Sequence, residues 1–124
     1  MKFYRCQHCG NIIVYALNSG VPVVCCGEEM QELTPGLVDA SREKHVPVIY
    51  ASGNLVTVDV GAIAHPMEDK HFITFIVLET RTGFQMAQLK PGGLPQAVFA
   101  LAPEDKAQAA WEYCNLHGLW KAEV

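Results

Sequence analysis

The stretch that decides the fold is residues 71–89, HFITFIVLETRTGFQMAQL. Its first ten residues are rich in aromatic and β-branched side chains, which pack well on a pleated, half-buried surface. RTG at 81–83 is a turn signal, and FQMAQL at 84–89 is a second strand candidate. The stretch therefore predicts two antiparallel strands joined by a short turn.

Further strand candidates flank this pair at regular spacing: VPVIY (46–50), LVTVDV (55–60) and AVFAL (97–101). In LVTVDV, period-2 alternation places Val56, Val58 and Val60 on one face. Short strands separated by turn signals predict an antiparallel sandwich or barrel. PEDKAQAAWEY (103–113) is the exception, because its residues have helical propensity. We expect a helical turn near 104–109, followed by a strand or an extended segment into Cys114.

Composition limits the classes of function. The chain has 124 residues, half of them hydrophobic, so it has enough apolar residues to bury a core as one domain or one domain with a small appendage. The net charge of −4 gives no electrostatic case for binding nucleic acid. We see no signal peptide and no run of the roughly 18–20 apolar residues that spans a membrane, so a cytoplasmic protein is expected.

The first 36 residues are expected to form a separate cysteine module, with the main domain over 37–124. NIIVYAL (11–17) and VPVV (21–24) are its short strand candidates, and TPG at 34–36 is a plausible boundary. So small a module cannot bury enough apolar surface to fold unaided, so we expect a metal to stabilise it.

Four of the five cysteines lie in this module, namely Cys6, Cys9, Cys25 and Cys26. Without a secretion signal we expect thiolate metal ligands rather than disulfides. A C-x2-C turn points two sulfurs at one centre, and a second pair completes a tetrahedral four-thiolate site for zinc or iron. Side chains of adjacent residues tend to point apart, so the pair at 25 and 26 should distort that tetrahedron. His8, inside the turn, is expected to face solvent because four thiolates already fill the site.

A second group of candidate ligands lies at the predicted strand edges: His45, His65, His71, His117 and Cys114. Loop ends on a β-scaffold are where functional sites are usually built. Each histidine alone is more often a surface or core residue, but together with the late cysteine they are most economically explained by one metal. Imidazole suits iron, copper, zinc and nickel, and a thiolate adds electron donation.

Three segments and the cysteine module together resemble a known family. SREKHVPVIY (41–50), AHPMEDKHFI (64–73) and EYCNLHGLWKAE (112–123) resemble the site segments of superoxide reductases. The C-x2-C-x15-C-C module resembles desulforedoxin. The whole chain is thus similar to the two-domain desulfoferrodoxin family, with the segments in matching order and spacing.

The resemblance implies the fold, the cofactors and the reaction. It implies an all-β protein, with a small desulforedoxin-like module followed by an immunoglobulin-like antiparallel β-sandwich. It implies two iron ions per chain: a four-thiolate iron on Cys6, Cys9, Cys25 and Cys26, and a catalytic iron. The catalytic iron has four equatorial ligands, His45, His65, His71 and His117, and Cys114 as its axial ligand. Its open sixth position binds superoxide, which is reduced to hydrogen peroxide without release of dioxygen.

The resemblance also assigns roles to Glu43 and Lys44, directly before His45. The matching glutamate binds the ferric iron after turnover, and the matching lysine attracts superoxide. Without the resemblance, Glu43 and Lys44 would be read as an ordinary pair of solvated charges. A rubredoxin or similar carrier as electron donor, and a homodimer, are further implications of the resemblance.

Three alternatives remain open from the residues. The first is a non-catalytic protein that binds zinc at the first site and zinc or nothing at the second. The second is an electron-transfer protein that uses both centres. The third is a dioxygen-using iron enzyme, which normally has two histidines and a carboxylate. This chain offers four histidines and a cysteine instead of that ligand set.

Overall fold

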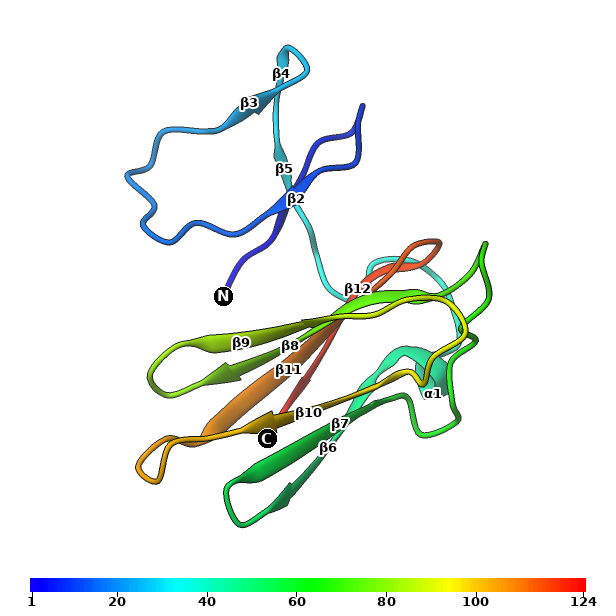
Figure 1. Ribbon diagram of the computed structural model, residues 1–124. Helices are drawn as coiled ribbons and strands as arrows, with labels where there is room; N and C mark the ends of the chain where they lie inside the picture. The colour runs from blue at the N-terminus through cyan, green and yellow to red at the C-terminus, as the bar shows by residue number, and fades with distance from the viewer. The chain divides into compact units, whose positions relative to one another are not determined.

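The structure is a computed structural model that describes all residues from 1 to 124. The chain forms two compact units, Met1–Thr34 and Pro35–Val124, each described by itself below (Figure 1). The division falls two residues before the boundary expected at residue 36.

The first unit is built from very short strands. One antiparallel sheet has the order β2-β1-β5, and β3 pairs with β4 in a hairpin. The strands are β1 (Tyr4–Arg5), β2 (Ile12–Ile13), β3 (Val24–Cys25), β4 (Glu28–Glu29) and β5 (Gln31–Glu32). The strand predicted over 11–17 is therefore wrong beyond Ile13, and of 21–24 only Val24 lies in a strand. Leu17 is 88% exposed, because the interior of so small a unit takes only a few side chains, such as Phe3 and Met30.

The second unit is a sandwich of two antiparallel sheets, with orders β10-β7-β6 and β12-β11-β8-β9 (Figure 1). Its elements are α1 (Arg42–His45), β6 (Pro47–Ser52), β7 (Leu55–Val60), β8 (Ile73–Thr80), β9 (Phe84–Gln88), β10 (Gln96–Ala100), β11 (Ala107–Cys114) and β12 (Gly118–Glu123). The predicted all-β fold is confirmed, with the strand pair of residues 71–89 as β8 and β9.

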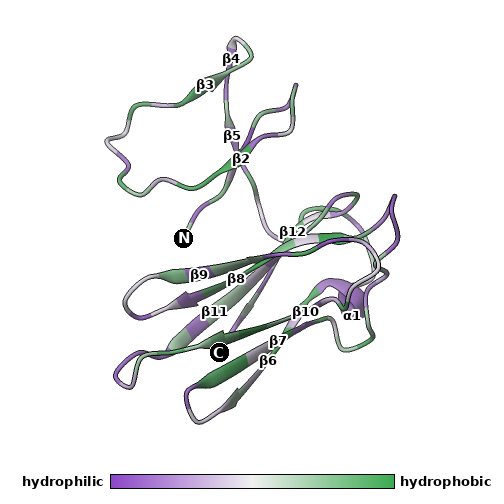
Figure 2. Ribbon diagram, in the orientation of Figure 1, coloured by the Kyte–Doolittle hydropathy of each residue, from purple (hydrophilic) through white to green (hydrophobic).

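The core lies between the two sheets. Val56, Val58 and Val60 are at most 1% exposed, so the predicted inward face of β7 is confirmed. Ile76 and Leu78 of β8 belong to the same buried cluster. Figure 2 shows the hydrophobic residues along β7 and β10. Burial on this scale, at roughly 25 cal/mol per Å² of apolar surface, is the main stabilising term for the sandwich.

The helical turn predicted near 104–109 is wrong. A turn closed by the hydrogen bond from the Asp105 N–H to the Ala102 carbonyl leads directly into β11, which begins at Ala107. β11 lies between β8 and β12, so both of its edges form ladder hydrogen bonds. Those bonds and the burial of Ala110 outweigh a helical propensity worth only tenths of a kcal/mol per residue.

The short helix α1 was not predicted. It spans four residues between the exposed Ser41 and β6, and His45, its last residue, is buried. No helix in the structure is long and apolar enough to span a membrane.

Candidate metal centres

Side chains from three separate segments of the sandwich unit meet at one place. Each offers one donor atom, and these atoms all lie within 4.8 Å of one another. The residues are His45 at the end of α1, His65 in the loop after β7, His71 before β8, Cys114 at the end of β11, and His117 before β12. The second predicted ligand group is thus brought together in the folded chain.

The four imidazole rings form a closed cycle in which each ring lies edge-on to the next. The ring centroids are 4.7 Å apart for His45 and His65, and 4.6 Å for His65 and His71. They are 5.1 Å apart for His71 and His117, and 4.9 Å for His117 and His45. Neighbouring planes differ by 73° to 86°. Such a cycle surrounds a single point with nitrogen donors.

Backbone carbonyls select the tautomers of two of these histidines. The Nδ1–H of His45 donates to the Ser41 carbonyl at 2.7 Å, and the Nδ1–H of His65 donates to the Pro66 carbonyl at 2.6 Å. Each Nε2 therefore keeps its lone pair, and the two Nε2 atoms lie 3.2 Å apart. Second-shell hydrogen bonds of this kind orient histidine ligands in metal sites.

The fit of this group to a metal ion is shown by His71. Its Nε2 is buried and has no hydrogen-bond partner. An unpaired buried nitrogen is costly unless a cation satisfies it. Burial lowers the pKa of His45 and His71, and it lowers the pKa of His65 to about 4. The rings are therefore neutral near pH 7, which is the form that binds a metal.

The Cys114 sulfur is fully buried and lies 3.8 Å from Nδ1 of His117. Burial raises the pKa of this thiol, while the backbone N–H groups of Leu116 and His117 act in the opposite direction. A bound cation would deprotonate the thiol outright. Four imidazoles and one thiolate fit an Fe(His)4(Cys) centre.

Glu43 and Lys44 lie on α1, immediately before His45, and both side chains are exposed. Neither belongs to the donor group. The positive charge of Lys44 nevertheless contributes to lowering the pKa of both His45 and His71. Lys44 is therefore close enough to act electrostatically on the centre while remaining in contact with solvent.

The four sulfurs of the first unit also lie within 4.8 Å of one another, and those of Cys9 and Cys25 are 3.6 Å apart. The backbone N–H groups of Cys9 and His8 lower the pKa of Cys6 to about 6. Hydrogen bonds to neighbouring sulfurs raise the pKa of Cys26 to about 12. Four crowded sulfurs resist full deprotonation until a cation binds among them, so the donor set fits an FeCys4 centre.

The backbone accommodates the adjacent cysteine pair. Cys26 has φ 52°, in the left-handed region that non-glycine residues seldom adopt, and Gly27 follows with φ 79°. This change of direction lets both neighbouring sulfurs reach one centre. His8 is exposed, as predicted, and its Nε2 lies 3.2 Å from a Glu28 carboxylate oxygen.

Two residues close to the second centre have contacts with its ligand segments that the sequence did not predict. Trp120 stacks on His45, and Asn115 hydrogen-bonds to the backbone on both sides of His71. Their positions in EYCNLHGLW were the only available signal, because both contacts join segments at least 43 residues apart.

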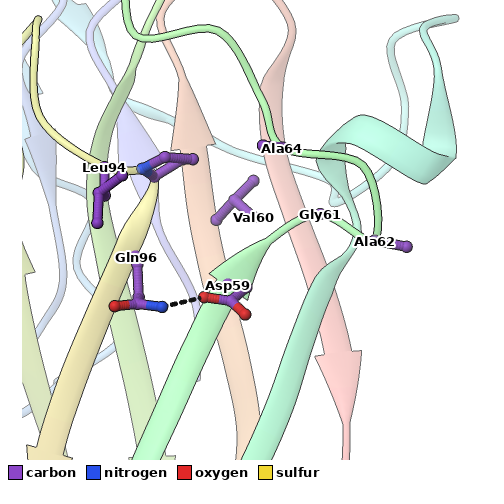
Figure 3. A pocket seen from close by; sticks show the side chains of 8 residues that line it. Asp59, Val60, Gly61, Ala62, Ala64, Leu94 and Gln96 are labelled. Carbon is purple, nitrogen blue, oxygen red and sulfur yellow. Dashed lines mark hydrogen bonds between the residues drawn. The ribbon is translucent and has the colours of Figure 1, made fainter.

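A surface pocket of about 250 Å³ lies elsewhere on the sandwich, where β7 ends beside the segment leading into β10 (Figure 3). Val60, Gly61 and Leu94 are among its lining residues, and Gln96 donates to Asp59 at 2.6 Å across its edge. No donor residue of either centre lines it, so the pocket gives no indication of the chemistry.

A four-thiolate group, together with a four-imidazole, one-thiolate group on a β-sandwich, defines a non-haem iron protein with two different centres. The sequence model described as "Desulfoferrodoxin, N-terminal domain" matches residues 1–33, and the one described as "Desulfoferrodoxin" matches residues 37–123. The chain belongs to the desulfoferrodoxin family.

Individual relatives match over the whole chain or over its larger part. A desulfoferrodoxin from Nitratidesulfovibrio vulgaris is 48% identical and covers 99% of this chain and 96% of its own. The superoxide reductase from Treponema pallidum superimposes with a TM-score of 0.83 and 38% identity, covering 98% of both chains. A structure described as "Superoxide reductase (1Fe-SOR)" from Giardia intestinalis is 37% identical, with a TM-score of 0.56, and covers 66% of this chain and 97% of its own.

Proposed function

We propose that this protein is a superoxide reductase that detoxifies superoxide at the second centre. The cycle of four imidazoles beside the buried Cys114 sulfur is the observation that carries the proposal. Five protein donors leave one position of a six-coordinate ion open, which a catalytic metal requires and an electron-transfer centre does not. When bound, the iron supplies the electron that converts superoxide, with two protons, to hydrogen peroxide.

The chain's own residues prepare the site for an anion. Carbonyls of Ser41 and Pro66 orient two neutral imidazoles, so the donor set carries only the single negative charge of Cys114. A divalent ion there keeps a net positive charge, which attracts superoxide. Lys44 adds a local positive charge on an otherwise acidic protein and guides the anion over a short range. Glu43, exposed on α1 next to Lys44, would supply a carboxylate ligand to the oxidised iron.

The two groups of ligands have separate roles in this proposal. His45, His65, His71, His117 and Cys114 would hold the catalytic iron, with Cys114 as its one thiolate ligand. Cys6, Cys9, Cys25 and Cys26 hold a one-electron centre that the reaction itself does not require. The match to a one-iron superoxide reductase over two thirds of this chain supports a dispensable first centre.

Two further parts of the proposal, a rubredoxin-like electron donor and a homodimer, come from the family resemblance. A third part, a cytoplasmic location, comes from the sequence, in which no signal peptide was seen. The exposure of Cys9 and Cys26 supports electron transfer from a protein donor to the first centre. Five free cysteines that group as metal ligands, rather than as disulfides, support a reducing compartment. Rapid mixing with reduced rubredoxin and measurement of the mass in solution test the donor and the dimer.

The deciding experiment is pulsed generation of superoxide against the reduced protein, followed by visible absorption. We expect oxidation of the second centre, with hydrogen peroxide formed and no dioxygen released. Cys114→Ser should lose the thiolate-to-iron absorption and most of the activity, whereas Cys6→Ser should retain the activity with an artificial electron donor. Dioxygen and peroxide in equal amounts would indicate dismutation, and no reaction would favour the binding or electron-transfer alternatives.

A further inference from the structure

We infer that Asn115 is a positioning residue that joins the segment carrying His71 to the turn carrying Cys114 and His117. The inference deepens the proposed function, since it rests on the second iron centre, but it does not depend on superoxide being the substrate.

Three hydrogen bonds connect the two segments through this one residue. The Asn115 side-chain oxygen accepts from the Phe72 N–H at 2.9 Å, and its amide nitrogen donates to the Lys70 carbonyl at 2.9 Å. The Asn115 backbone N–H donates to the Phe72 carbonyl at 3.2 Å. The partners at 70 and 72 flank His71, so Asn115 fixes the backbone on both sides of that ligand.

His71 needs this support more than His45 and His65 do. Those two rings are each held by an Nδ1–H bond to a backbone carbonyl, but no such bond to the ring of His71 is found. The His71 backbone is also bonded to Glu68. The Glu68 N–H donates to the His71 carbonyl at 2.9 Å, and the His71 N–H donates to the Glu68 carbonyl at 3.1 Å. The position of the His71 ring therefore depends on its backbone.

The residue type suits the task. Asparagine offers one acceptor and two donors on a short side chain, so it can accept from one peptide and donate to another two residues away. Asn115 lies between Cys114 and His117 in the chain, so its bonds to the segment of His71 link three of the five metal donors. The side chain is exposed, so its loss should affect the centre more than the global fold.

The test compares iron release from the full-length protein carrying both irons. Asn115→Ala removes both side-chain hydrogen bonds, and Asn115→Asp keeps the acceptor for Phe72 but loses the donor to Lys70. Gln85→Ala is the matched control, because it removes an exposed amide that bonds to the Ala100 carbonyl far from the centre. The four-thiolate iron of the same molecule serves as the internal reference for protein concentration and for the action of the chelator.

We expect Asn115→Ala to release the second iron to a chelator faster than the wild type, with a loss of iron affinity of roughly ten- to a hundredfold, the range typical of lost second-shell partners. Asn115→Asp should be intermediate, and Gln85→Ala should match the wild type. Hydrogen exchange by mass spectrometry adds a readout independent of activity: the Phe72 amide should exchange faster in Asn115→Ala and remain protected in Asn115→Asp.

Wild-type release and exchange in Asn115→Ala would overturn the inference. Equal acceleration in Gln85→Ala would also overturn it, because the effect would then not be specific to this contact. Failure of the wild type to reduce superoxide would contradict the proposed function and leave these expected results unchanged.

Discussion

The indole ring of Trp120 stacks on the imidazole of His45, with ring centroids 5.0 Å apart and planes 27° apart. The same indole donates its Nε1–H to the His117 carbonyl at 3.1 Å. Trp120 is only 2% exposed, so its ring is held firmly. One buried side chain thus supports two ligands that are separated by 72 residues in the sequence.

Trp120→Phe should keep a ring against His45 but leave the His117 carbonyl unpaired. The loss of one hydrogen bond should lower stability by about 1 kcal/mol. We expect a lower Tm and a shifted thiolate-to-iron absorption band, with the four-thiolate spectrum unchanged. An unchanged absorption band would show that the indole bond does not influence the second centre.

Lys44→Ala should slow the reaction with superoxide a few-fold at low salt and weaken its dependence on ionic strength. The physical reason is the loss of local attraction for a small anion. Lys106→Ala is the matched control, because it makes the same change in net charge near the opposite end of β8, where the Arg81 N–H donates to the Lys106 carbonyl. Equal slowing in both variants would indicate an effect of net charge rather than steering by Lys44.

Gly61→Ala should disturb the segment that carries Glu43 and Lys44. A Cβ at this position would lie 2.5 Å from the Glu43 carbonyl oxygen and 2.8 Å from the Lys44 carbonyl carbon. Both contacts are with backbone, so relief requires movement of α1, and overpacking of this kind costs about 1–3 kcal/mol. We expect a lower Tm and a slower reaction with superoxide. Gly83→Ala, where a Cβ meets nothing within 4 Å, should change neither.

Asp105→Asn should lower stability in a pH-dependent way. The carboxylate accepts from the hydroxyls of Thr80 and Thr82, each at 2.7 Å, and from the backbone N–H groups of Thr82 and Lys106. These bonds, that to Thr80 foremost, lower the pKa of Asp105 to about 2.

Because this pKa is lowered on folding, the stabilisation is complete above the unfolded value of about 3.9 and is lost as the pH falls through about 2. Melting curves should therefore show a gap of several degrees between wild type and Asp105→Asn above pH 4, narrowing in more acidic solution. Protonation of the metal ligands affects both proteins alike. A gap that does not change with pH would contradict the prediction.

Glu112→Met should stabilise the protein. Glu112 is fully buried on β11 on the same side as Ala110 and Cys114, and neither of its carboxyl oxygens has a hydrogen-bond partner. Burial raises the pKa of this carboxyl well above its usual range. Removing an unpaired buried polar group at similar volume should add about 1–3 kcal/mol. Glu112→Gln should not give this gain, and a lower Tm for Glu112→Met would show that the carboxyl has a stabilising partner.

The local pattern of hydrophobic residues was sufficient to predict most strands of the sandwich. The alternation of Val56, Val58 and Val60 identifies the inward face of β7, because side chains alternate across a strand wherever it pairs. Pattern failed at 104–109, where the pairing of β11 with β8 and β12 overrides helical propensity. It also failed in the first unit, where strands of two residues leave almost no periodicity to read.

The residue types available to each centre could be read from the sequence: four cysteines near the N-terminus, and four histidines and one cysteine at predicted strand edges. These are local features of residue type and spacing. The folded chain was needed to show that the histidines form a closed cycle, that Trp120 stacks on His45, and that Asn115 holds the backbone on both sides of His71. Such relationships join segments tens of residues apart, and they exist only after the packing of the two sheets has brought those segments together.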